Sequence, residues 1–204
     1  MPEPRISLEA DKYFHIFNHG VGSENIFIDE RNYNFFLINF KEYISPYADL
    51  LSYCLMPNHF HLAVRFHSFD EIRKEFIFQN IIKDSTLTHE KLSELLSQQF
   101  SNYFNRYAKS FNKQEYRRGT LFMSAFKRKP IDSDYYLKRL IRYIHLNPVN
   151  DNFASLPSDW KYSSYNSLIS LKPTLLTRDE VISLFDTVDN FIYFHQQKDD
   201  AFEF

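Results

Sequence analysis

The sequence predicts an α+β fold, in which an antiparallel sheet carries two helices on one face and a tyrosine-bearing helix near a histidine-containing strand. Short aromatic and β-branched runs with alternating polarity predict strands, and longer stretches with apolar residues at helical spacing predict helices. These segments follow one another as strand, helix, strand, strand, helix, strand and helix. At 204 residues the chain has the size of one ordinary domain with a small appendage.

Turn signals bound the elements expected in the first half of the chain. The three predicted strands are residues 13–17, 50–56 and 59–66. A helix is expected between the first two, with Asp29 as its N-cap and its end before Pro46. The dipeptide Pro57-Asn58 is typical of the turn that would join the second and third strands into an antiparallel pair.

The second half begins with a short apolar segment, residues 76–82, and a polar stretch. A long helix follows, whose apolar stripe comprises Leu92, Leu95, Leu96, Phe100, Tyr103, Phe104 and Tyr107. After the turn at Arg118-Gly119 we expect a strand over 120–131. The last predicted helix begins near Asp134 and stops near Pro148, because proline removes a helical hydrogen bond.

The first six elements match the split βαβ pattern of a ferredoxin-like domain. We therefore expect a main domain over 1–150. Beyond Asn150 the composition turns acidic, and Thr177-x-x-Glu180 is a capping box before a short apolar run. Residues 151–204 are predicted to form a small acidic, mainly helical C-terminal extension.

Composition excludes several classes of protein. Apolar residues make up 44% and charged residues 25% of the chain, and no apolar run reaches the roughly 18 residues of a membrane span. The single Cys54 cannot form an internal disulfide. Because neither end shows a secretory signal pattern, we expect a cytoplasmic protein without membrane contact.

The net charge of -2 conceals a local excess of positive charge. Residues 101–150 hold 11 basic and 3 acidic residues, a net of +8, whereas the segments on either side are acidic. Such a concentration is typical of a face that binds a polyanion, and equally of a solvated face that balances two acidic ends.

The segment His59-Phe60-His61 lies in a predicted strand, where alternation places both imidazoles on one face and Phe60 on the other. Two histidines at this spacing can bind one divalent ion. The alternative is a pair of half-exposed histidines in an ordinary strand.

On the helix before Pro148, Tyr143 lies off the apolar stripe and one turn from Asn147. A phenol can act as a nucleophile in phosphoryl transfer, and a carboxamide oxygen suits a hard cation. Alternatively, Tyr143 lies at a core margin and Asn147 simply precedes a helix-stopping proline.

These motifs together resemble the single-tyrosine HUH transposases, specifically the REP-associated tyrosine transposase branch. "LLSYCLMPNHFHLAV" is similar to the family's histidine-hydrophobic-histidine strand. "GTLFMSAFKRKPI", "YLKRLIRYIHLNPV" and "DWKYSSY" resemble its later blocks in order and spacing. The chain departs from the family at His19, where an arginine is usual, and at Asp151, which adds negative charge near the expected path of phosphates.

The resemblance implies a metal-dependent single-stranded DNA endonuclease and strand transferase that acts at hairpin-forming elements. His59, His61 and Asn147 would hold Mg²⁺ or Mn²⁺, and Tyr143 would form a 5′-phosphotyrosine intermediate. Residues 1–150 would be the HUH transposase-like catalytic domain.

The expected partner is single-stranded or hairpin DNA. The basic residues that we expect to contact it, with phenylalanines between them for stacking, are Arg117, Arg118, Lys127, Arg128 and Lys129. Alternation along the predicted strand separates Arg128 from the two lysines. The oligomeric state, monomer or homodimer, is left open.

Two other functions fit the sequence. A domesticated, non-catalytic DNA-hairpin-binding protein is favoured by the departures at His19 and Asp151. A metal phosphodiesterase that uses water as the nucleophile would not need Tyr143.

Overall fold

The computed structural model describes residues 6–22, 24–83 and 86–197. The strands are β1 (Tyr13–His19), β2 (Ala48–Met56), β3 (His59–Phe66) and β4 (Lys127–Ile131). The helices are α1 (Glu30–Tyr43), α2 (Phe69–Phe78), α3 (His89–Gln114), α4 (Asp134–Asn150), the 3₁₀ turn η1 (Pro157–Asp159), α5 (Tyr165–Ile169), α6 (Arg178–Ser183) and α7 (Val188–Gln196).

The four strands form one sheet in the order β2-β3-β1-β4, in which every neighbouring pair is antiparallel. β1 and β3 occupy the centre, and the register places His19 opposite His59 and Tyr13 opposite Arg65. This is the strand order that the split βαβ pattern predicts, so the α+β fold class is confirmed.

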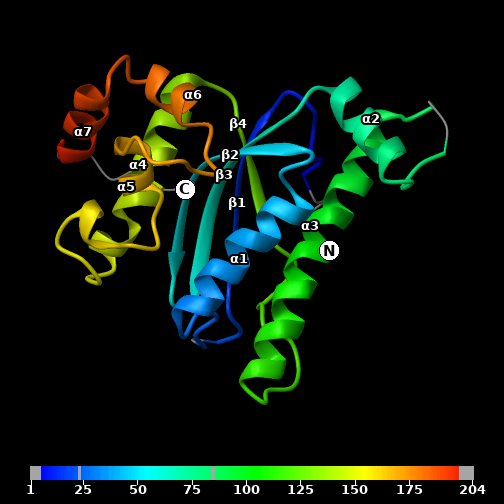
Figure 1. Ribbon diagram of the computed structural model, residues 1–204, viewed down its shortest axis with the longest axis horizontal. Coiled ribbons are helices and arrows are strands. Elements are labelled where there is room, and N and C mark those ends of the chain that lie inside the picture. The colour runs from blue at the N-terminus through cyan, green and yellow to red at the C-terminus, as the bar shows by residue number, and fades with distance from the viewer. Residues whose placement is uncertain (1–5, 23, 84–85, 198–204) are drawn as a thin grey trace.

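Helices cover both faces of the sheet. α1 and α3 lie together on one side, and α4 lies on the other with the C-terminal helices (Figure 1). Phe60 of β3 points to the α1 and α3 side, where its ring centroid lies 5.0 Å from that of Phe36 and 5.1 Å from that of Phe104. Phenylalanine side chains therefore fill the core between the sheet and these two helices.

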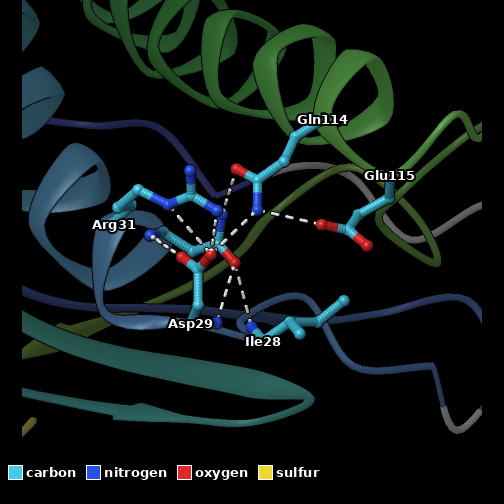
Figure 2. A network of polar contacts seen from close by, with 6 residues as sticks. Ile28, Asp29, Arg31, Gln114 and Glu115 are labelled. Carbon is cyan, nitrogen blue, oxygen red and sulfur yellow. Dashed lines mark hydrogen bonds and ion pairs between the residues drawn. The ribbon is translucent and has the colours of Figure 1, made fainter.

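Polar contacts fix the start of α1 against the end of α3, as Figure 2 shows. The Asp29 side chain caps α1 and also accepts a hydrogen bond from Nε2 of Gln114 at 3.2 Å. Arg31 donates to the same Asp29 carboxylate. The two helices are thereby tied at one end, in addition to their shared aromatic core.

The strand expected over 120–131 is shorter, because β4 begins only at Lys127. Residues 120–126 run as a loop beside the end of β1, where the Asn18 side chain donates to the Ser124 carbonyl at 3.0 Å. Two backbone hydrogen bonds also join the loop to this end of β1, from the Met123 N–H to the His19 carbonyl at 2.9 Å and from the Val21 N–H to the Leu121 carbonyl at 3.0 Å, and they form an isolated antiparallel bridge. The apolar residue Phe122 was part of the strand pattern, but its ring packs 5.7 Å from Phe104 of α3 instead.

The apolar segment 76–82 is partly the end of the helix α2. Its N-cap is Ser68, and Glu71 completes a capping box. Phe76 of this helix packs 4.6 Å from the ring of Tyr47, so the apolar residues cover the end of the core.

α4 ends near Pro148, as expected; it includes the proline and its last residue is Asn150. Proline lacks its own N–H, yet the Asp151 N–H still donates to the Asn147 carbonyl at 3.0 Å. Because the helix ends within one turn of the proline, only a small part of its hydrogen bonding is affected. This final turn places Asn147 and Asp151 one helical turn apart.

Candidate active site

Two imidazoles of β3 point to the α4 side of the sheet. His59 and His61 flank Phe60, whose side chain is fully buried on the opposite face. His61 is almost completely buried, whereas the side chain of His59 keeps 20% of its exposure. The strand therefore presents one imidazole at the opening of the site and one beneath it.

The turn before β3 is held against the end of β1. The Gly20 N–H donates to the Asn58 carbonyl at 2.8 Å. A Cβ atom at position 20 would lie 2.4 Å from the Glu24 carbonyl oxygen, so this close approach requires glycine. Oδ1 of Asn58 lies 2.7 Å from Nδ1 of His59. It accepts the Nδ1 proton in the tautomer that leaves the Nε2 lone pair available to a metal.

α4 supplies an amide between the two imidazoles. Oδ1 of Asn147 lies 2.7 Å from Nε2 of His59, and Nδ2 lies 3.4 Å from Nε2 of His61. Three polar side chains from two elements thus converge on one point. Within the described ranges, no three His, Cys, Asp or Glu side chains gather closely enough to hold a metal by themselves, so a metal site here depends on the Asn147 amide.

Tyr143 lies one turn before Asn147 and contacts the His61 imidazole. Its ring centroid is 5.3 Å from that of His61, and the two ring planes are nearly perpendicular at 79°. The side chain is half-buried. Burial and then the Asp151 carboxylate raise the pKa of Tyr143, while a hydrogen bond with Asn147 lowers it. The phenol is therefore protonated at neutral pH and must lose its proton if it attacks a phosphate.

A third histidine, His15 of β1, supports the site and was missed by sequence reasoning. Its Nε2 atom lies 2.9 Å from Nδ1 of His61, and its side chain is buried. Nothing in the sequence around His15 marks it, because its proximity to His61 depends on the pairing of β1 with β3. Two residues apart on facing strands, they are diagonal neighbours on the α4 side.

The imidazoles of the site are held neutral. Burial, with a smaller effect of Lys129, lowers the pKa of His15 to about 3. Burial, and then His15 and His59, hold the pKa of His61 well below its ordinary value. Burial also lowers the pKa of His59, although Asn147 and Asp151 oppose this shift. Neutral imidazoles are the form that binds metal ions.

The basic residues expected to contact DNA lie in different places. Lys127 and Lys129 are on the α4 side of β4, where Nζ of Lys127 lies 5.9 Å from the Phe17 ring centroid. Arg128 points to the other side, is 8% exposed, and donates to Oγ of Ser97 at 2.7 Å. The structure therefore does not bring Arg128 to the face of the two lysines.

The two remaining arginines lie in the turn after α3. Arg117 forms an ion pair with Glu24 and donates to the Asn112 side chain at 3.1 Å. Arg118 is exposed. Of this pair, Arg118 is the one whose side chain faces solvent, whereas Arg117 takes part in joining the turn to the segment after β1.

The fold is that of an α+β domain in which a tyrosine and an asparagine from one helix face two histidines of a central strand. No family model matches the chain. A solved structure of a REP-associated tyrosine transposase bound to a REP hairpin superimposes with a TM-score of 0.57 and 14% identity, over 85% of this chain and 88% of that one. This match shows the shared fold.

A curated protein of Haemophilus influenzae, provisionally named a REP-associated tyrosine transposase, is 24% identical over 120 residues. The match covers 58% of this chain and 59% of the length of that relative. The chain is thus similar to REP-associated tyrosine transposases in sequence and in fold, as its motifs predicted.

Within residues 6–22, 24–83 and 86–197, no helix is both long enough and apolar enough to cross a membrane.

Proposed function

We propose that this protein is a metal-dependent single-stranded DNA endonuclease and strand transferase of the single-tyrosine type, acting at hairpin-forming elements. The observation that carries the proposal is the position of Asn147. Its amide lies between the Nε2 atoms of His59 and His61, one helical turn from Tyr143, whose ring packs against His61. A phenol beside a cluster of neutral metal-ligand groups suits phosphoryl transfer better than a structural role.

The residues fit a divalent cation with open coordination positions. Two imidazole nitrogens and one amide oxygen converge, and Asn58 and His15 are placed to accept the Nδ1 protons of the two imidazoles. Mixed nitrogen and oxygen ligands suit Mn²⁺ or Mg²⁺. When bound, the ion would polarise the scissile phosphate and neutralise charge that develops on it.

Tyr143 supplies the nucleophile in this proposal. Its oxygen forms a bond to phosphorus, and the bond from phosphorus to the 3′-oxygen breaks. The phenol loses its proton to a base, and the released 3′-oxygen gains one, so the products are a 5′-phosphotyrosyl link and a free 3′-hydroxyl. Because the phosphotyrosyl bond keeps the energy of the cleaved bond, a second 3′-hydroxyl can reverse the step without ATP.

Lys127, Lys129 and Arg118 are the candidates for contacts to the DNA backbone. The two lysines flank the site on its own face of the sheet, and Arg118 is exposed in the turn after α3. Cations here would neutralise phosphates on either side of the cleaved bond. Hairpin DNA as the partner is supported by the REP hairpin bound in the structural neighbour. A DNA substrate fits the expected cytoplasmic location.

Residues 1–150, which contain the site, would form the catalytic domain, and residues 151–204 the acidic helical extension.

The deciding experiment uses the Tyr143→Phe variant. Wild-type protein, hairpin DNA carrying a radiolabel and Mn²⁺ should give a covalent adduct on a denaturing gel. Tyr143→Phe removes one oxygen and keeps the ring, so cleavage and adduct should disappear while hairpin binding remains. Tyr135→Phe is the matched control, because this exposed tyrosine begins the same helix and should leave both products unchanged.

The same experiment separates two rival functions. A phosphodiesterase that uses water would give cleavage without an adduct, and Tyr143→Phe would still cut. A non-catalytic hairpin-binding protein would give neither product even as wild type. Cleavage by Tyr143→Phe at the wild-type rate contradicts the proposed mechanism.

A further inference from the structure

Asp151 lies at the end of α4 and faces the candidate metal site. Its Oδ2 atom is 3.9 Å from Nε2 of His59, the same atom that lies 2.7 Å from Oδ1 of Asn147. Its negative charge also raises the pKa of Tyr143 and of Cys54, two residues near these histidines. The side chain keeps 44% of its exposure. It thus lies at the opening of the site.

The helix end beside Asp151 has negative charge of its own and no basic residue in its last turn to offset it. Asp151 is the C-cap of α4, and the C-terminal end of a helix carries partial negative charge. The last turn of α4 contains no basic residue. The Oδ2 atom of Asp151 faces His59, whose pKa burial lowers, so this imidazole does not neutralise the carboxylate at neutral pH. A bound cation would compensate both the carboxylate and the helix end.

We propose that Asp151 is the anionic group of the metal site, placed beside His59 on the open side of the Asn147 amide. This inference rests on the proposed function, because it concerns the same metal. The other three groups, His59, His61 and Asn147, are all uncharged, so without Asp151 the site supplies no negative charge to a divalent ion.

The carboxylate would alter the properties of the site in two ways. It adds a hard oxygen, which favours Mg²⁺ and Mn²⁺ over softer metals. It also makes phosphate binding depend strongly on the ion, since the carboxylate would repel DNA phosphates when the site is empty and be neutralised when the site is filled. The acidic residue at this position is then part of the metal chemistry and not a defect in a DNA-binding surface.

The test measures binding of Mn²⁺ alone to the full chain, by titration calorimetry and by the loss of the free-ion EPR signal. Three proteins are compared: wild type, Asp151→Asn, and a double variant that combines Asp151→Asn with Asn152→Asp. The double variant keeps the net charge and moves the carboxylate by one residue. Asn152 has a φ of 62°, a conformation that aspartate tolerates. Melting temperatures without metal serve as the folding control.

We expect Asp151→Asn to weaken Mn²⁺ binding about tenfold or more and to reduce the rise in melting temperature that Mn²⁺ causes. The double variant should stay as weak as the single one. Unchanged Mn²⁺ affinity in Asp151→Asn overturns the inference, and tighter hairpin binding in that variant would then show a purely repulsive role. Recovery of affinity in the double variant also overturns it, because net charge would suffice.

A failure of the proposed function would give a different result in this experiment. If wild type binds Mn²⁺ no better than a His59→Ala, His61→Ala double variant, both the metal site and the role of Asp151 are wrong. If wild type binds Mn²⁺ and loses it on replacement of the histidines, while Asp151→Asn binds normally, only the role of Asp151 is wrong.

Discussion

Nε2 of His15 lies 2.9 Å from Nδ1 of His61, and this contact fixes which nitrogen of His61 can face a metal. If Nδ1 donates its proton to His15, the Nε2 lone pair points toward Asn147 and the site. His15 is therefore a positioning residue: it lies on β1, the strand beside β3, and orients His61 toward Asn147.

His15→Leu should weaken Mn²⁺ binding by about 10- to 100-fold, as loss of a supporting hydrogen bond does at other metal sites. Calorimetry measures the affinity, and long-range ¹⁵N spectra report the tautomer of His61. The spectra should show the Nδ1–H tautomer in wild type and a mixture in the variant. His89→Gln changes an exposed histidine and serves as the control. Equal affinity in wild type and His15→Leu would contradict the positioning role.

Mn²⁺ binding should require the side-chain oxygen of Asn147, whether the group that carries it is a neutral amide or a carboxylate. Asn147→Ala removes the amide that lies 2.7 Å from His59 and should weaken Mn²⁺ binding, whereas Asn147→Asp keeps an oxygen and should retain it. Asn150→Ala changes an exposed asparagine in the last turn of the same helix and controls for effects on α4. Tight binding by Asn147→Ala would remove Asn147 from the site.

Most of the candidate site could be predicted because its residues are paired by local geometry. Alternation along a strand places His59 and His61 together, and one helical turn joins Tyr143 to Asn147. His15 could not be predicted in this way. Its distance from His61 depends on the register between β1 and β3, and many registers fit the same apolar pattern.

The strand expected over 120–131 differs from the structure for a similar physical reason. Residues 120–126 meet the end of β1 at an isolated bridge and not as a continuous strand, while the Phe122 ring packs toward α3, so burial extends further along this segment than strand pairing does. The end of α4 near Pro148 was predicted, and the helix includes the proline because its cost is small near a helix end. Within β4 the alternation was informative, since it separated Arg128 from Lys127 and Lys129, and the structure places them on opposite sides of the sheet.

Acid should destabilise the protein through its buried histidines, which are His145 and His195 between α4 and α7 together with His15 and His61 of the candidate site. Burial lowers the pKa of His195 to about 4, and burial, followed by the effect of His195, holds the pKa of His145 well below its usual 6.5. The unfolded chain therefore takes up protons first as the pH falls. Stability should be complete above pH 6.5 and decline progressively toward pH 4.

Urea unfolding followed across this pH range measures the effect. The stability lost should be on the order of several kcal/mol, since each unit of pKa difference corresponds to about 1.4 kcal/mol. His195→Gln should flatten the profile, and the exposed control His89→Gln should not. A wild-type profile that is flat down to pH 4 would show that these histidines are not held neutral.

The C-terminal helix α7 should contribute to the stability of the nucleophile-bearing helix α4. Phe191 of α7 is fully buried, and its ring lies 5.8 Å from that of His145 on α4. Phe191→Ala should lower the free energy of unfolding by about 3–5 kcal/mol, as for other buried aromatic residues. Tyr193→Ala, on the exposed side of the same helix, should change it by less than about 0.5 kcal/mol. Equal effects of the two changes would show that α7 is not packed on α4.

The salt dependence of hairpin binding should separate Lys129 from Arg128, although they are adjacent in sequence. Lys129 lies on the face of the candidate site, so Lys129→Gln should reduce the slope of log affinity against log salt by about 0.7–0.9 if it contacts one phosphate. Arg128→Gln should instead lower the melting temperature, because its guanidinium is buried against Ser97 and lies 4.4 Å from the Phe126 ring centroid. Lys41→Gln, on the exposed surface of α1, should change neither quantity. A change of slope with Arg128→Gln but none with Lys129→Gln would place the DNA on the other side of the sheet.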